Sequence, residues 1–133
     1  MIGIVIVTHK ELAEALLGVW DLIMGRQEGI AAVSLDPNDP SEVSRQQIQQ
    51  ALARVNNGSG VIILTDMLGG TPSNLTLTFL ETGKVEVVTG VNLPMLMKLA
   101  HIRDQSDLRQ VALALQQSGQ KGITVASEVL RQK

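Results

Sequence analysis

Two positions in this chain combine reactive side chains with a suitable place in the sequence. His9 follows the apolar run from residue 2 to 7, and Asp66 follows the apolar run from residue 61 to 65. An imidazole is nucleophilic when one ring nitrogen keeps a free lone pair, and a carboxylate that accepts a hydrogen bond from the other ring N–H fixes that tautomer. The two residue types therefore predict a histidine nucleophile with Asp66 as its orienting partner.

The residues after Asp66 have the composition of an anion cradle. Gly69, Gly70 and Thr71 lie just before Pro72. Adjacent glycines let main-chain N–H groups approach an oxyanion without obstruction by a Cβ, and a helix N-terminus adds positive potential. Thr71 is a good N-cap and Pro72 fits the first helical position, so we expect a short helix from Pro72 to about residue 80. Gly69, Gly70 and Thr71 are thus the expected anion-binding residues.

The residues around His9 also match a helix start. Thr8 and Glu11 have the spacing of a capping box. In this motif the Thr8 hydroxyl accepts a hydrogen bond from one main-chain N–H at the start of the helix, and the Glu11 side chain reaches back to accept from another. We expect His9 to lie in that first turn. The apolar stripe formed by Leu12, Leu16, Trp20 and Ile23 predicts a helix that packs on the core and stops at residue 25.

Four short runs rich in β-branched residues alternate with helical patterns. The runs cover residues 2–7, 30–35, 61–65 and 85–89, and helices are expected over residues 41–55, 95–100 and 108–115. This alternation predicts an α/β fold with an open, doubly wound, mainly parallel sheet in the order 2-1-3-4 and helices on both faces. That order brings the loops carrying His9 and Asp66 together at the carboxyl edge. Residues 123–126 form an expected short edge strand.

Composition limits the class of protein. The chain has 133 residues, 44% of them hydrophobic, and a formal charge of −2, which fits one domain over residues 1–133 without a general affinity for nucleic acid. The absence of cysteine and the presence of only two histidines argue against thiolate catalysis and a dedicated metal centre. No apolar run approaches the roughly 20 residues of a membrane span, so we expect a cytoplasmic protein without direct membrane insertion.

These features together favour phosphoryl transfer through a phosphohistidine at His9. Taken singly, each has a structural reading: a histidine at a helix start is often a surface residue, and a glycine pair is often a tight turn. The loop after the first run has no glycine and there is no Walker lysine motif, so Asp36 does not indicate a dinucleotide site and no P-loop is expected. His101 is interpreted as a surface or C-cap residue.

Three blocks of the chain resemble the IIA component of the mannose-class sugar phosphotransferase system, which handles mannose, fructose and sorbose. The blocks are residues 4–9, residues 66–74 and residues 90–96, in that order. The resemblance implies that His9 accepts a phosphoryl group from the phosphocarrier HPr and passes it to a IIB component. It also implies that Asp66 hydrogen-bonds the ring, that residues 69–71 cradle the phosphoryl group and that no cofactor is needed.

The resemblance further implies a homodimer that exchanges a C-terminal edge strand, for which residues 123–126 are the candidate. Lys10 stands where many members have glycine, and its charge bears on how a partner docks. The chain ends shortly after the domain, so a free-standing IIA component is expected, with its partners on separate polypeptides.

Two other functions use the same site. A regulatory module would bind a target protein and signal carbon status without transport, and a subunit of a dihydroxyacetone kinase would pass its phosphoryl group to a bound nucleotide. The Gly-Gly-Thr-Pro run favours the mannose class over the kinase subunit. A purely structural module would give no reason for His9 and the loop at residues 66–74 to converge.

Overall fold

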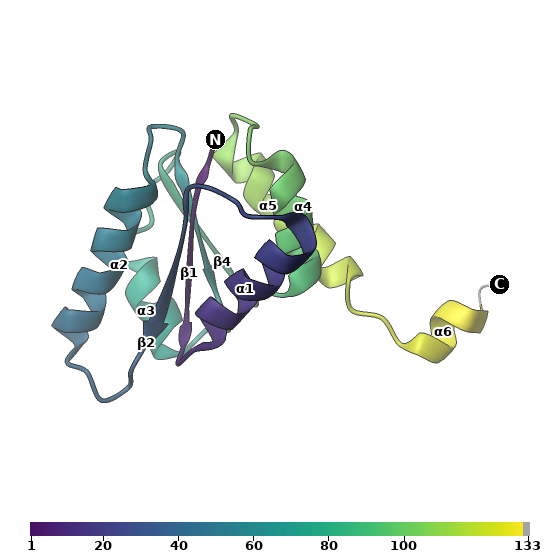
Figure 1. Cartoon of the computed structure of the whole chain (residues 1–133), viewed down its shortest axis with the longest axis horizontal. Coiled ribbons are helices and arrows are strands. Elements are labelled where there is room, and N and C mark those ends of the chain that lie inside the picture. The colour runs from purple at the N-terminus through teal and green to yellow at the C-terminus, as the bar shows by residue number, and fades with distance from the viewer. Residues whose placement is uncertain (132–133) are drawn as a thin grey trace.

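A computed structural model describes residues 1–131, in which four parallel strands form one sheet between two layers of helices (Figure 1). The strands are β1 (Gly3–His9), β2 (Ile30–Leu35), β3 (Val61–Thr65) and β4 (Val85–Thr89). Their order, β2-β1-β3-β4, confirms the predicted topology. β1 and β3 are therefore the central strands.

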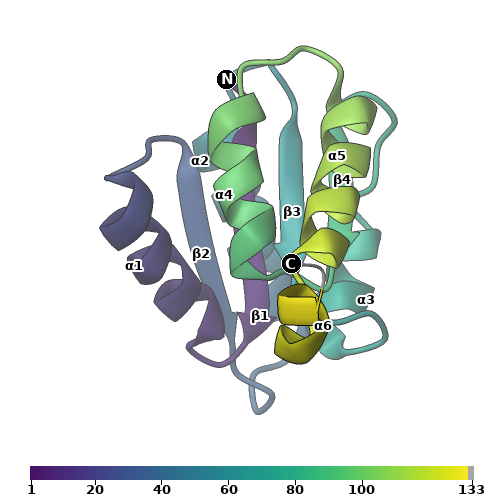
Figure 2. The same ribbon diagram turned by 90° about the vertical axis from the view of Figure 1, so that its right-hand side faces the viewer.

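Helices cover both faces of the sheet (Figure 2). One face carries α1 (Leu12–Met24), α4 (Leu93–Ile102) and α5 (Leu108–Lys121), and the other carries α2 (Ser41–Val55) and α3 (Thr71–Leu77). Side chains alternate along β1, so Ile4 and Ile6 join the core under α1, α4 and α5, while Val5 and Val7 join the core under α2. Within residues 1–131, no helix combines the length and hydropathy needed to cross a membrane.

The structure corrects the expected start of α1. β1 continues to His9, so His9 is the last residue of a strand and lies outside the helix. The main-chain N–H of Lys10 donates to the carbonyl of Leu35 at 3.0 Å, which carries the pairing with β2 past the predicted end. The Thr8 hydroxyl does cap the helix, but it accepts from the N–H of Ala13 at 2.7 Å, and Glu11 makes no side-chain cap. There is consequently no capping box.

α3 begins one residue before its predicted start and is shorter than expected. Gly70, in extended conformation, is its N-cap, and Thr71 is its first residue. The hydroxyls of Thr76 and Thr78 donate to carbonyls three residues earlier, at 2.9 and 2.6 Å. Such hydrogen bonds compete with the main-chain pattern of a helix, which fits its end at residue 77.

The apolar stripe of α1 is only partly buried. Trp20 is fully buried, whereas Leu12 and Ile23 are 46% and 56% exposed. α1 lies beside the edge strand β2, so the sheet and α4 cover only a narrow part of its surface (Figure 2). The prediction that the whole stripe belongs to the core was wrong.

The C-terminal segment also differs from expectation. α5 runs through Gly119 to Lys121, and a Cβ at Gly119 would lie only 3.1 Å from Cε of Met95 on α4. Residues 123–125 make no strand, and α6 (Ala126–Arg131) follows them. A strand needs a neighbour for its N–H and C=O groups, but this segment leads away from both edges of the sheet (Figure 1).

Candidate functional site

His9 and Asp66 meet at the carboxyl edge of the sheet. They are 57 residues apart in sequence, but β1 and β3 are hydrogen-bonded neighbours, so their ends lie side by side. Nδ1 of His9 lies 2.7 Å from Oδ2 of Asp66, and the main-chain N–H of His9 donates to the same oxygen at 3.1 Å. The other carboxylate oxygen accepts from the N–H of Met67 at 3.0 Å. The pair that the sequence predicted is therefore in contact.

The electrostatics of the pair favour an ionised carboxylate. Burial acts to raise the pKa of Asp66, but hydrogen bonds from the His9 ring and main-chain N–H, together with the charge of His9, outweigh it and leave the pKa below its ordinary value. The Asp66 side chain is 14% exposed, whereas that of His9 is 46% exposed. The carboxylate is thus held inside the site while the imidazole remains open to a partner.

The hydrogen bond assigns the ring's tautomer. An ionised carboxylate only accepts, so the contact requires Nδ1 of His9 to carry the proton. Neutral imidazole then keeps its lone pair on Nε2. The arrangement leaves a nucleophilic nitrogen directed away from Asp66.

Gly70 is close to that nitrogen. A Cβ built on Gly70 would lie 2.7 Å from Cε1 and 3.2 Å from Nε2 of His9, so any larger residue would displace the ring. Gly69 has φ of +94°, the left-handed conformation that glycine adopts without strain. Thr71 starts α3 with an exposed side chain. Of the three predicted cradle residues, the structure thus places Gly70 on the Nε2 side of His9.

Three further residues lie around the site, and one of them, Lys10, was already expected from the sequence to affect how a partner docks. Met67 and Leu68 are 56% and 68% exposed and form an apolar rim on the loop after Asp66. Lys10 has φ of +48° and is the one non-glycine residue in residues 1–131 with positive φ. The apolar pair in the glycine-rich loop can be seen in the sequence, but the left-handed backbone of Lys10 depends on tertiary pairing with Leu35.

Other polar candidates lie outside the site. Oδ1 of Asp36 accepts from the N–H of Asn38 at 2.8 Å in a turn after β2. His101 is exposed in the last turn of α4. In the part of the chain that the structure describes, no three histidine, cysteine or acidic residues are grouped in a way that could hold a metal ion.

Comparison with known proteins identifies the family. The EIIA-man family, described as "PTS system fructose IIA component", matches residues 3–116. A mannose-specific EIIAB component of Escherichia coli is 33% identical over 125 residues, covering 92% of this chain and 38% of that protein. The chain thus spans well under half the length of this relative. A fructose-specific EIIA component of Bacillus subtilis is 28% identical over 98% of this chain and 90% of its own.

The solved structures agree with this assignment. The phosphotransferase system component EIIA from Streptococcus agalactiae superposes with a TM-score of 0.85 at 30% identity, covering 96% of this chain and 99% of its own. A mannose/sorbose-specific IIA subunit from Enterococcus faecalis gives 0.82 at 26% identity, with 93% of each chain covered. Both fold and sequence point the same way, and the chain belongs to the EIIA-man family, the IIA components of sugar phosphotransferase systems.

Proposed function

We propose that this chain is a phosphoryl carrier in which His9 accepts a phosphoryl group from phosphorylated HPr and passes it to a IIB component for sugar uptake. The observation that carries the proposal is the 2.7 Å contact between Nδ1 of His9 and Oδ2 of Asp66, which leaves Nε2 free beside Gly70. Family membership supports a role in a sugar phosphotransferase system.

In the proposed transfer, the lone pair of Nε2 attacks phosphorus and a bond from phosphorus to Nε2 forms. The bond between phosphorus and the donor breaks, and the donor keeps that electron pair. Nδ1 retains its proton, and the carboxylate of Asp66 stabilises the positive charge that develops on the ring. The second transfer, to IIB, reverses these changes at His9.

The cradle supplies the remaining stabilisation in this proposal. Main-chain N–H groups of Gly69, Gly70 and Thr71 are proposed to hold the phosphoryl oxygens, with the Thr71 hydroxyl as a further donor. The half-exposed ring of His9 supports a reaction between docked proteins, because a phosphoryl group on Nε2 stays within reach of a partner. No metal or nucleotide takes part.

Phosphorylation of purified variants by phosphorylated HPr tests the assignment. Wild type is expected to gain one acid-labile phosphoryl group that maps to His9, and His9→Gln is expected to gain none. The matched control is His101→Gln, which removes the exposed histidine at the end of α4 and should behave as wild type. Undiminished incorporation by His9→Gln would exclude the phosphohistidine.

Discharge of the phosphorylated protein separates transport from the alternatives. We expect the phosphoryl group to pass from this chain to the IIB component of its system. In the presence of the membrane component it should then pass from IIB to the sugar. A protein that charges but does not discharge onto IIB would instead be a regulatory module, and discharge onto a bound nucleotide would indicate a kinase subunit.

We also propose that residues 1–133 form one IIA domain that works as a cytoplasmic homodimer. The C-terminal segment supports dimerisation, because Ile123, Val125 and Leu130 are 75%, 65% and 68% exposed in the single chain. Exchange of this segment between copies would cover these side chains. Light scattering should give a dimer for the full chain and a monomer for a chain ending at residue 121.

A further inference from the structure

The outer edge of β2 is unpaired in the described chain. β2 pairs only with β1, and the N–H groups of Ile4 and Lys10 donate to the carbonyls of Gly29 and Leu35, both at 3.0 Å. Main-chain groups alternate in direction along a strand, so residues 29, 31, 33 and 35 turn their N–H and C=O toward β1. The N–H and C=O groups of Ala32 and Ser34 must therefore point outward.

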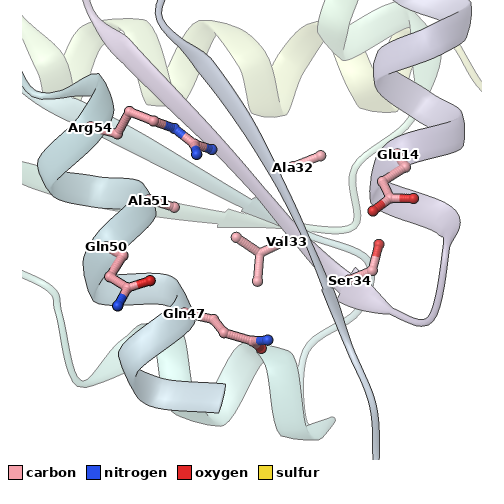
Figure 3. A pocket seen from close by; sticks show the side chains of 8 residues that line it. All are labelled: Glu14, Ala32, Val33, Ser34, Gln47, Gln50, Ala51 and Arg54. Carbon is pink, nitrogen blue, oxygen red and sulfur yellow. The ribbon is translucent and has the colours of Figure 1, made fainter. Parts of the chain in front are cut away.

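A cleft of about 280 Å³ lies on this edge (Figure 3). Ala32, Val33 and Ser34 form its base. Gln47, Gln50 and Arg54 line the side formed by α2, and Glu14 lines the side formed by α1. The cleft therefore has main-chain hydrogen-bonding groups at its base and polar or charged side chains on both walls.

The edge lacks the usual protection against strand addition. Proteins commonly guard an exposed edge with a lysine, a proline or a bulge, and residues 30–35 contain no charged residue and no proline. Ala32 and Ala51 are small, which leaves room above the strand. The Ser34 hydroxyl oxygen is buried and finds no hydrogen-bond partner within residues 1–131.

The cleft continues toward the active-site edge. A second cleft, of about 420 Å³, shares Ser34 and extends past Leu35 to Lys10 and Asp36. Lys10 directly follows His9, so a segment lying along β2 would end beside the loop that carries the histidine. A protein that exchanges phosphoryl groups with His9 has to dock next to this loop.

We propose that the edge of β2 docks an extended segment of the phosphoryl-exchanging partner, which adds to the sheet as a strand beside Ala32 and Ser34. The inference rests on the proposed function, because that function requires protein partners at His9. The two outward N–H and two outward C=O groups offer four main-chain hydrogen bonds. Arg54 selects an acidic side chain on the α2 side, and Glu14 selects a basic one on the α1 side.

These charges favour a different protein over a second copy of this chain. Two β2 edges paired antiparallel about a two-fold axis would place both α1 helices on the same face, with Glu14 from each copy at the junction. Like charges brought together in this way oppose pairing. A partner segment with one acidic and one basic side chain meets no such repulsion.

Amide exchange measured by NMR tests the docking directly, with HPr and the IIB component of the same system as separate probes. With one of them, the amide protons of Ala32 and Ser34 are expected to exchange at least about tenfold more slowly. Ala31 and Val33 are internal controls, because their N–H groups already pair with β1 and should not change.

Three variants extend the test to phosphoryl transfer. Ala32→Pro removes one outward N–H and leaves the β1 side intact, and Arg54→Glu reverses the charge on the α2 wall. Each is expected to raise KM for the docked partner about tenfold, without changing the maximal rate, since the loss of one main-chain hydrogen bond or charge contact costs about 1.4 kcal/mol of binding free energy. The matched control, Arg109→Glu, reverses an exposed charge on α5 beside the opposite edge strand and should match wild type.

The outcomes distinguish the two proposals. If wild type is not phosphorylated at His9, the proposed function fails. If it is phosphorylated but Ala32 and Ser34 gain no protection and Arg54→Glu keeps the wild-type KM, only the docking inference is overturned. This holds even if Ala32→Pro fails to fold. Dissociation of a dimer by Ala32→Pro or Arg54→Glu would make the edge an interface between copies and would also overturn it.

Discussion

Nδ1 of His9 lies 2.7 Å from Oδ2 of Asp66, and the main-chain N–H of His9 donates to the same oxygen at 3.1 Å. The carboxylate therefore holds both the ring and the main chain of His9. Its other oxygen accepts from the N–H of Met67. Both carboxylate oxygens of Asp66 thus accept hydrogen bonds.

Asp66→Asn is expected to lower the rate of phosphoryl transfer about 100-fold. An amide has one acceptor oxygen, so its NH₂ must face either Met67 N–H or the His9 donors. Rapid-quench kinetics with phosphorylated HPr measures the effect. Asp36→Asn is the control, because that carboxylate lies in a separate turn after β2. Equal rates for Asp66→Asn and wild type would contradict an orienting role.

Gly70→Ala is expected to slow transfer about 100-fold with little loss of fold, because its Cβ would meet Cε1 of His9 at 2.7 Å and displace the ring. Gly58→Ala is a matched control. Gly58 has φ of +94° and nothing within 4 Å of the added Cβ, so the change should cost about 1 kcal/mol of stability and leave transfer intact. Chemical denaturation measures the loss of stability, and transfer kinetics measures the loss of rate. Slow phosphoryl transfer by Gly58→Ala would contradict the assignment of the Gly70→Ala effect to contact with the His9 ring.

Lys10→Gly is expected to raise the free energy of unfolding by about 0.5–1 kcal/mol. The left-handed conformation at φ of +48° costs a residue with a Cβ about 1–2 kcal/mol, and the greater freedom of glycine in the unfolded chain offsets part of the gain. Urea denaturation gives the value. Lys10→Ala removes the charge but keeps the Cβ and should show no comparable gain; a similar gain in both variants would assign the effect to charge.

The stability of the fold should depend on pH through Asp66. Its pKa in the folded protein lies below the ordinary value of 3.8, so between these two pKa values the unfolded chain binds more protons. Stability then rises with pH in that interval, is complete above the ordinary pKa, and is lost as pH falls through the folded pKa. Unfolding free energies measured across the acidic range should show a smaller rise for Asp66→Asn than for wild type.

Much of the architecture follows from local sequence. The runs at residues 30–35, 61–65 and 85–89 became β2, β3 and β4 with the expected bounds. Segments rich in β-branched residues favour strands, although of these three only β3 is buried along its whole length, whereas β2 and β4 are half-buried. The end of α1 at Gly25 and of α2 at residue 55 also matched, because glycine and asparagine interrupt helices locally.

The tertiary structure decided features that depend on neighbours. Pairing with Leu35 extended β1 to His9 and placed Lys10 in a left-handed turn. The position of α1 at the sheet edge left Leu12 and Ile23 exposed, although their spacing alone matched a buried stripe. Residues 123–125 have no strand partner within residues 1–131, so strand propensity there had no effect.

For the site, the sequence by itself determined which residue types were available: a histidine, a carboxylate and a glycine pair, each at the end of a strand or the start of a helix. It also carried the strand order, through the alternation of strands and helices. The sequence also predicted that His9 and Asp66 would pair, but which ring nitrogen makes the contact, the direction of the free Nε2 and the need for glycine at position 70 were decided only by the folded chain. These features depend on distances between residues far apart in sequence, which are set when β1 and β3 pair.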